Sequence, residues 1–157
     1  MRTWVDASTL IAIDLAGEVE VLRTLLGRVS VTKEVAAEVF TGRESRVLRE
    51  AAGTWIEVAE VRGDRRRWTT LGLGLGEASL FLTPAGDRLV LDEIPARTVA
   101  EAEGRAYVGL LGLLLAGVRR GLLTRDRARE VLRKVVESGF HLASPLHDRF
   151  LADLEEG

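Results

Sequence analysis

Short apolar segments alternate with helical segments along this chain of 157 residues, and no other feature restricts the possible folds as strongly. The segments predicted as strands are 3–6, 28–32, 55–61, 88–91 and 106–108. The segments predicted as helices are 8–17, 18–26, 33–40, 44–52, 76–83 and 95–104, with further helices beginning near 110, 124 and 144. Strands that alternate with helices form a parallel sheet with helices on both faces. The sequence therefore predicts an α/β fold, a three-layer α/β/α sandwich with a central, mostly parallel sheet, in one domain spanning 1–157.

The chain has no cysteine and only two histidines, His141 and His147. The lack of cysteine excludes disulfide frameworks, thiolate zinc sites and cysteine nucleophiles. Two histidines are a poor supply for a histidine-rich metal site or a Ser-His-Asp triad. We therefore expect any enzyme chemistry in this chain to use carboxylates. The formal net charge of −2 excludes a strongly basic domain, although a local basic patch remains compatible with nucleic-acid binding.

The N-terminus carries no secretory signal, because Asp6 and then Asp14 interrupt the apolar stretch that follows Arg2. The most apolar segment, 108–118, is too short to cross a bilayer. We expect a soluble, cytoplasmic protein with no membrane partner.

Acidic residues follow two of the predicted strands at the point where each strand ends. Asp6 closes the first strand, and Asp92 and Glu93 come directly after the strand 88–91. The carboxyl ends of parallel strands lie at one edge of the sheet, which is where ligands bind in such folds. We therefore expect these three side chains to share that edge.

Two more acids belong to helices near the same edge. Glu77 lies in the first turn of a helix that begins from the glycine-rich segment 71–76, and Glu38 is predicted on the buried side of the helix 33–40. Carboxylates brought together repel one another, and Mg²⁺ or Mn²⁺ relieves that repulsion. Such an ion suits phosphodiester hydrolysis. On the pattern alone, the interpretation that each acid is a solvated helix cap stays open.

Two other kinds of site do not fit the chain. Gly72, Gly74 and Gly76 have the wrong spacing for a dinucleotide-binding fingerprint, and they follow a late loop rather than the first strand. A phosphatase of the dehalogenase type needs a second aspartate two residues after the first, and Ser8 stands there.

The most basic segment of the chain includes Arg65, Arg66, Arg67 and Trp68. Basic side chains beside an aromatic ring are typical of grooves that bind single-stranded nucleic acid, where charge meets phosphate and the ring stacks on bases. The alternative is a solvated loop in which Trp68 packs against the edge of the core.

Five motifs in order along the chain resemble the PIN-domain family, in particular the PIN-like nucleases related to VapC toxins. They are VDASTLI at 5–11, VSVT at 29–32 with its helix to Glu38, GLGEAS at 74–79, LVLDE at 89–93 and GLLGLL at 109–114. The resemblance runs nearly end to end, and the family fold is an α/β sandwich with a parallel sheet.

The resemblance implies Mg²⁺- or Mn²⁺-dependent cleavage of single-stranded RNA that leaves a 5′-phosphate and a 3′-hydroxyl. The catalytic acids that it implies are Asp6, Glu38, Glu77 and Asp92, of which Asp6, Asp92 and Glu77 would bind metal. Ser8 and Glu93 would support the site. The family also leads us to expect a homodimer, a possible role as the toxin of a toxin–antitoxin pair, and inhibition by a small antitoxin protein.

The sequence departs from the family pattern at three positions. Thr32 stands at a corner that is commonly proline, the acidic pair is Asp92-Glu93 rather than two aspartates, and Leu110 stands where relatives often have threonine. The lost hydroxyl at Leu110 favours an alternative function, a catalytically degenerate module that binds RNA or a protein partner without cleavage.

Overall fold

The computed structural model describes residues 1–41, 45–139, 149–150 and 152–155, and these contain a five-stranded sheet in which each pair of neighbouring strands is parallel. The strands are β1 (Thr3–Val5), β2 (Val29–Thr32), β3 (Ile56–Ala59), β4 (Arg88–Val90) and β5 (Tyr107–Val108). Their order across the sheet is β3-β2-β1-β4-β5. The predicted parallel sheet is therefore confirmed. His141, His147 and the predicted helix start at Ser144 lie outside the described residues.

The middle strand β1 pairs with β2 on one side and with β4 on the other. The chain builds the sheet from β1 through β2 to β3, and then returns to the far side of β1 to add β4 and β5. The direction of strand order thus changes between β1 and β4. In open α/β sheets, ligands bind at the carboxyl ends of the strands at such a switch point.

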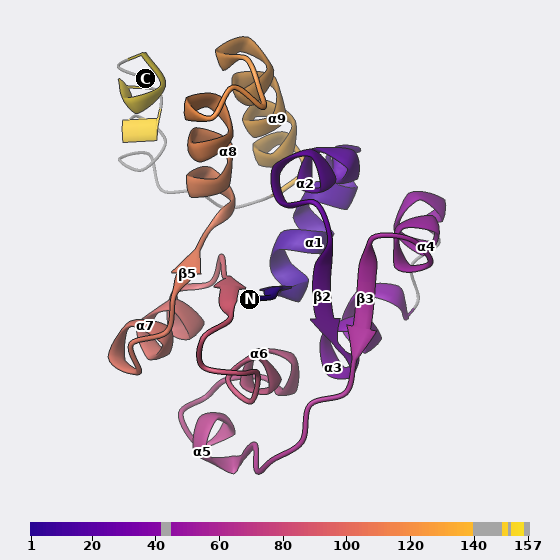
Figure 1. The fold of residues 1–157 in the computed structure, drawn as a ribbon, viewed down its shortest axis with the longest axis vertical. Helices are drawn as coiled ribbons and strands as arrows, with labels where there is room; N and C mark the ends of the chain where they lie inside the picture. Colours follow the sequence, from indigo (N-terminus) through magenta and orange to yellow (C-terminus); the bar gives the residue numbers. More distant parts are fainter. Residues whose placement is uncertain (42–44, 140–148, 151, 156–157) are drawn as a thin grey trace.

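Helices flank the sheet along its length (Figure 1). They are α1 (Ala7–Leu15), α2 (Val19–Leu26), α3 (Lys33–Phe40), α4 (Arg46–Ala52), α5 (Arg66–Thr69), α6 (Leu75–Leu80), α7 (Ile94–Ala102), α8 (Leu110–Arg119) and α9 (Arg125–Glu137). In Figure 1, α2, α8 and α9 gather at one end of the molecule, and the arrowheads of β2 and β3 point toward α3 and α6 at the other. None of the helices in the described ranges combines the length and the apolar composition that a membrane crossing requires.

Two of the strand-to-helix connections have almost no loop, because the helix is capped by the last residue of the strand (Thr32) or by the residue directly after it (Asp6). The Asp6 carboxylate accepts a hydrogen bond from the Thr9 backbone N–H at 2.9 Å, and the Thr32 hydroxyl accepts one from the Val35 N–H at 3.1 Å. Capping side chains of this type satisfy backbone donors that the first turn leaves free. These caps fix the starts of α1 and α3 at the carboxyl edge of the sheet.

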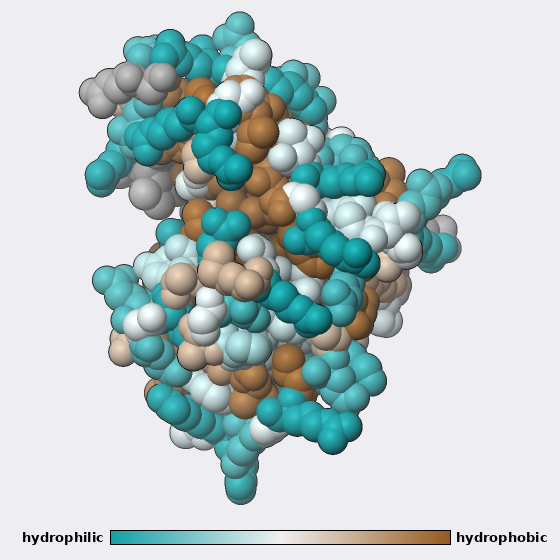
Figure 2. Space-filling view, in the orientation of Figure 1, coloured by the Kyte–Doolittle hydropathy of each residue, from teal (hydrophilic) through white to brown (hydrophobic). Residues whose placement is uncertain are grey.

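The core fills the space between the sheet and its helices, and it includes Trp4 and Trp55, as the sequence predicts. Figure 2 shows polar residues over most of one face, with apolar side chains gathered where α8 lies beside α2. The segment 62–70, predicted to be a polar loop, contains the short helix α5. The strand predicted at 55–61 is shorter, since β3 covers Ile56–Ala59.

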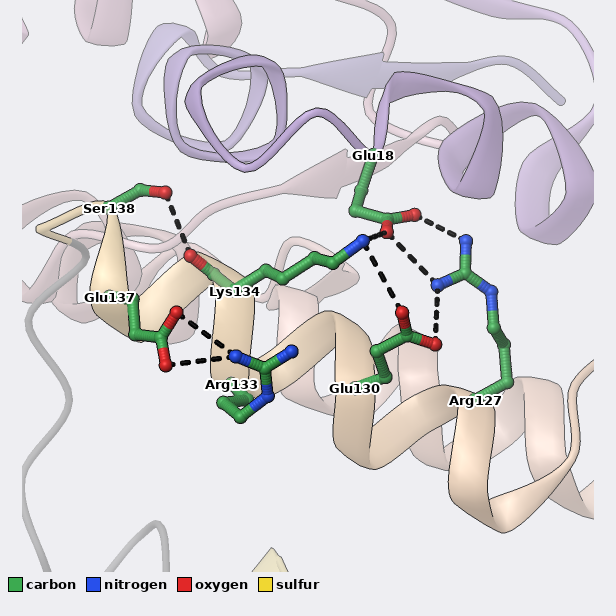
Figure 3. Close-up of polar contacts among 7 residues, drawn as sticks. All are labelled: Glu18, Arg127, Glu130, Arg133, Lys134, Glu137 and Ser138. Carbon is green, nitrogen blue, oxygen red and sulfur yellow. Dashed lines mark hydrogen bonds and ion pairs between the residues drawn. The ribbon is translucent and has the colours of Figure 1, made fainter.

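Helix α9 is fastened to the α1–α2 junction by a buried carboxylate (Figure 3). Glu18 is 4% exposed and binds the Arg127 guanidinium and, at 2.9 Å, the Lys134 ammonium. Burial opposes ionisation of Glu18, but these hydrogen bonds and charges lower its pKa overall. Glu130 joins both cations from the same helix. These contacts fix α9 against the α1–α2 junction. Ser138, directly after α9, lines the same groove as residues of α1.

Candidate functional site

Asp6 joins the ends of the two central strands. It is 2% exposed, and while Oδ1 accepts the capping hydrogen bond from Thr9, Oδ2 accepts one from the Asp92 backbone N–H at 3.0 Å. Burial raises the pKa of Asp6 to about 7, the negative charge of Asp92 adds to this, and the hydrogen bonds oppose it. A proton or a cation is therefore needed to offset the charge of Asp6 at neutral pH.

Asp92 follows β4 and faces the same edge. Its carboxylate accepts the Leu110 backbone N–H, at 3.0 Å to Oδ1, and the hydroxyl of Thr9 on Oδ2. Burial raises the pKa of Asp92, although these donors and the positive charge of Arg97 oppose the shift. The sequence analysis missed Thr9. The position of Thr9, in the first helical turn after Asp6, could have pointed to it, because that turn lies at the carboxyl edge of the sheet.

Glu77 enters the cluster from the first turn of α6. Its Oε2 atom is buried and has no hydrogen-bond partner. Burial raises the pKa of Glu77, the charges of Glu93 and Glu38 raise it further, and a hydrogen bond from the Gly74 backbone opposes them. A buried acceptor without a donor costs free energy, which a bound cation or proton would recover.

Glu38 reaches the site because Gly76 has no side chain. A Cβ atom built on Gly76 would lie 2.3 Å from Glu38 Oε1, far closer than real atoms approach. The prediction that Glu38 lies on the buried side of its helix is wrong. Val35 and Val39 take the core-facing positions, so Glu38 is left on the exposed side and leans over α6.

Buried hydroxyls hold α3 and α6 together beneath these two glutamates. The Thr32 hydroxyl lies 2.7 Å from that of Ser79, which donates to the Gly76 carbonyl at 2.6 Å. Both side chains are buried. This chain of hydrogen bonds fixes the start of α3 against α6 where proline is common in the family pattern.

Glu93 completes the cluster from an exposed position. Its carboxylate accepts a hydrogen bond from the hydroxyl of Ser8. These are the two residues that the sequence predicts to support the site. A cavity of about 80 Å³ is enclosed by eight residues, namely Asp6, Ala7, Ser8, Glu38, Gly74, Gly76, Glu77 and Glu93. The structure therefore brings four of the five predicted acids to one cavity.

Asp92 borders a second, wider space beside this cavity. That groove has a volume of about 460 Å³, and its acidic edge is formed by Glu38, Asp92 and Glu93. The apolar part of its lining includes Ile11 and Leu15 of α1. Both spaces are lined by Glu38 and Glu93, so the five acids border two neighbouring spaces.

The donor set fits a hard divalent cation. Among the described residues, no group of three or more histidine, aspartate or glutamate side chains has the arrangement of a metal site. Even so, the orphaned Oε2 atom of Glu77 and the raised pKa values of Asp6, Asp92 and Glu77 mark negative charge that the protein itself does not balance. Carboxylate oxygens are the ligands that Mg²⁺ and Mn²⁺ prefer.

Trp68 is part of the core rather than a base-stacking platform. Its ring is 6% exposed and stacks on Phe81, with centroids 5.9 Å apart, and its indole N–H donates to Glu103 at 2.7 Å. The Arg67 guanidinium also lies over the ring, 5.3 Å from its centroid. The ring cannot stack on RNA, which agrees with the alternative given in the sequence analysis.

The two other arginines of that segment are bound to carboxylates. Arg65 forms an ion pair with Glu34 at 2.7 Å, and Arg66 forms one with Asp64 at 2.8 Å. The Arg66 guanidinium lowers the pKa of Asp64 to about 2. These pairs leave less of the segment's charge available for phosphate.

Comparison with known families identifies the family to which this fold belongs. A family model described as a PIN domain matches residues 3–156. The chain belongs to the PIN-domain family. PIN domains are generally nucleases and typically use divalent metal ions, which agrees with the acidic cluster of this PIN domain. No curated protein and no solved structure gives a match.

Proposed function

We propose that this PIN domain is a metal-dependent endoribonuclease that hydrolyses phosphodiester bonds in single-stranded RNA. The observation that carries the proposal is the buried, unpartnered Oε2 atom of Glu77 in a cavity that it shares with Asp6, Glu38 and Glu93. Buried acceptors are almost always satisfied in folded proteins. An exception within an acidic cavity supports a cation as the missing partner.

Asp6, Asp92 and Glu77 would hold Mg²⁺ or Mn²⁺, with Glu38 and Glu93 at the border of the same region. Such an ion lowers the pKa of a bound water and offsets negative charge on the phosphate that the water attacks. The neighbouring groups keep the ligands in place. Thr9 and the Leu110 N–H orient Asp92, and the Asp92 N–H orients Asp6. Partners of this kind commonly tune the affinity of a metal site.

Glu77 and Glu38 are suited to orient water or to accept its proton. Burial and neighbouring charge raise the pKa of Glu77, so its carboxylate takes up a proton more readily than an isolated glutamate. Ser8 holds Glu93 on the open side of the cavity. The wider groove beside this cavity supplies room for a flexible strand.

The test combines metal binding and cleavage on the same samples. Titration calorimetry with Mn²⁺ and Mg²⁺ is followed by incubation with a mixed pool of single-stranded RNA, on the wild type and the Asp6→Asn/Asp92→Asn double variant. Asp126→Asn is the matched control, because that carboxylate is 95% exposed on α9. We expect the double variant alone to lose both metal binding and cleavage, and the wild-type products to carry 5′-phosphates.

Binding of metal and RNA without cleavage by the wild type would instead support the degenerate binding module. The feature behind that alternative was the hydroxyl missing at Leu110. Thr9 supplies a hydroxyl to Asp92 from α1, so this departure no longer argues against catalysis. A folded wild-type protein that binds no metal and cuts no RNA would contradict the nuclease proposal.

We also propose that the enzyme acts as the toxin of a toxin–antitoxin pair, as a homodimer that a small antitoxin protein inhibits. This proposal rests on the resemblance to VapC-related nucleases. A short open reading frame directly upstream of the gene would support it, and light scattering on the purified protein measures the oligomeric state. Growth arrest on expression, relieved by coexpression of the upstream frame, is the expected result.

A further inference from the structure

The proposed substrate is a polyanion, yet the site is surrounded by acids. None of the described residues that line the small cavity or the wider groove is lysine or arginine. Binding of RNA at this edge therefore needs a cationic side chain just outside those walls. Arg97 is half-buried and lies one turn after Glu93, to whose carbonyl its backbone N–H donates at 3.1 Å.

Gly109 is the point where Arg97 and Asp92 approach each other. A Cβ atom built on Gly109 would lie 2.8 Å from Asp92 Oδ1 and 3.7 Å from Arg97 Nη2. The guanidinium and the carboxylate therefore flank one glycine, without forming an ion pair in the described structure. The charge of Arg97 is still felt, since it opposes the rise in the pKa of Asp92.

The guanidinium of Arg97 is held in place by an aromatic ring rather than by a hydrogen-bond acceptor. It lies 5.4 Å from the centroid of Tyr107 on β5. Cation–π contacts of this kind orient a guanidinium and leave its N–H donors free. In the described part of the chain no acceptor for these donors is found, whereas Arg65, Arg66 and Arg127 are all bound to carboxylates.

We propose that Arg97 binds a phosphate group of the RNA beside Asp92. The inference rests on the proposed nuclease function and assigns the residue that meets the substrate's charge. A guanidinium whose donors are unpaired matches the oxygens of a phosphate in a two-pronged arrangement that lysine cannot reproduce. The competing role is a structural one, in which Arg97 only holds Asp92 in place for the metal.

Salt dependence of RNA binding separates these two roles. The probe is a labelled 12-nucleotide random-sequence RNA pool, titrated with the wild type and with Arg97→Met at several salt concentrations in Ca²⁺, under conditions where gels show the RNA to be intact. Loss of one phosphate contact reduces the slope of log K against log salt by about 0.7 for single strands. Arg28→Met is the control, because Arg28 is exposed before β2, at the opposite edge of the sheet.

We expect Arg97→Met to bind RNA roughly tenfold more weakly with the smaller slope, Arg97→Lys to recover the slope but only part of the affinity, and Arg28→Met to match the wild type. Affinity for Mn²⁺ without RNA should not fall in Arg97→Met, because Arg97 forms no ion pair with Asp92 in the described structure and its positive charge opposes a nearby cation.

An unchanged slope in Arg97→Met would overturn the proposal, as would loss of Mn²⁺ affinity, which would assign Arg97 the structural role. Should Arg97→Met fail to fold by circular dichroism, Arg97→Gln supplies the same comparison. If the wild type binds Mn²⁺ but no RNA at all, the proposed nuclease function fails together with this inference. If the wild type binds RNA with a slope that Arg97 variants leave unchanged, this inference alone fails.

Discussion

The hydroxyl of Thr9, on the first turn of α1, donates a hydrogen bond to the Asp92 carboxylate at the end of β4. Thr9 is fully buried, and its own backbone N–H binds Asp6. One residue therefore contacts both of the acids that follow the central strands.

Replacing Thr9 with valine should weaken metal binding while the fold persists. Valine keeps the shape of threonine but removes the donor, so Asp92 loses the contact that orients Oδ2. Groups that orient metal ligands typically change affinity by about 10–100-fold. We expect a loss in that range for Mn²⁺ by calorimetry in Thr9→Val, and recovery in Thr9→Ser. Equal affinities in the wild type and Thr9→Val would show that the hydroxyl has no such role.

The stability of the metal-free protein should fall as the pH rises from about 4 to about 7. The folded pKa of Asp6, about 7, lies above the ordinary value of 3.8, so the folded state binds a proton that the unfolded state has released. The stabilisation is complete below pH 3.8 and is lost as the pH passes the folded value. Three pKa units correspond to roughly 4 kcal/mol.

Urea unfolding in EDTA measures this loss across the pH range. In Asp6→Asn the decline should be smaller, because the titrating group is absent, with Asp92 and Glu77 supplying the remainder in the same direction. Addition of Mg²⁺ at pH 8 should restore stability to the wild type more than to the variant. If the stability of the wild type fell with pH no more than that of Asp6→Asn, burial would not raise the pKa of Asp6 as described.

Gly76→Ala should separate activity from stability. The added Cβ meets the end of the Glu38 side chain, which can turn away without disturbing the backbone. Alanine inside a helix also stabilises by about 0.5–1 kcal/mol relative to glycine. We expect a melting temperature equal to or above that of the wild type. The cleavage rate should be at least tenfold lower, which corresponds to an activation barrier higher by roughly 1.4 kcal/mol or more.

The matched control is Gly74→Ala, because a Cβ at that position meets nothing within 4 Å. Cleavage in this variant should equal that of the wild type. Equal loss of activity in both variants would assign the effect to the glycine-rich segment as a whole rather than to Glu38.

Glu18→Gln should destabilise the fold by about 1.5–3 kcal/mol, because it removes charge-assisted contacts to Arg127 and Lys134, which are partly exposed and keep Glu130 as a partner. Chemical denaturation measures the change, and Glu20→Gln, on the exposed side of α2, is the control. A loss below about 1 kcal/mol would mean that apolar packing alone holds α9.

The sequence predicted the sheet and the position of Asp6 and Asp92 because both depend on local pattern. Short apolar segments that end in acids identify the strand ends, and parallel pairing then brings those ends together. Glu77 was found in the same way, since the turn that begins α6 is marked by glycine. For these residues, the topology required no knowledge of side-chain contacts.

The misses arise where a side chain finds its partner far away in the chain. For Trp68 the sequence left base stacking and packing against the core both open, because its partners Phe81 and Glu103 lie outside its own segment. Glu38 was predicted on the buried side from its apolar neighbours, but helical geometry gave the core to Val35 and Val39. The role of Thr9 depends on an acid 83 residues later, a distance that no local pattern reports.

The hydrogen bond from the Asp92 N–H to Asp6 joins residues 86 positions apart, and Asp92 is oriented by the still later Leu110. When only the first half of the chain has been synthesised, Asp6, Glu38 and Glu77 are present but Asp92 is not, so the ligand set is incomplete. The acids meet only when β4 has been added beside β1. Fragments from interrupted translation would lack the complete acidic cluster, so the proposed activity requires a chain that extends at least past Leu110.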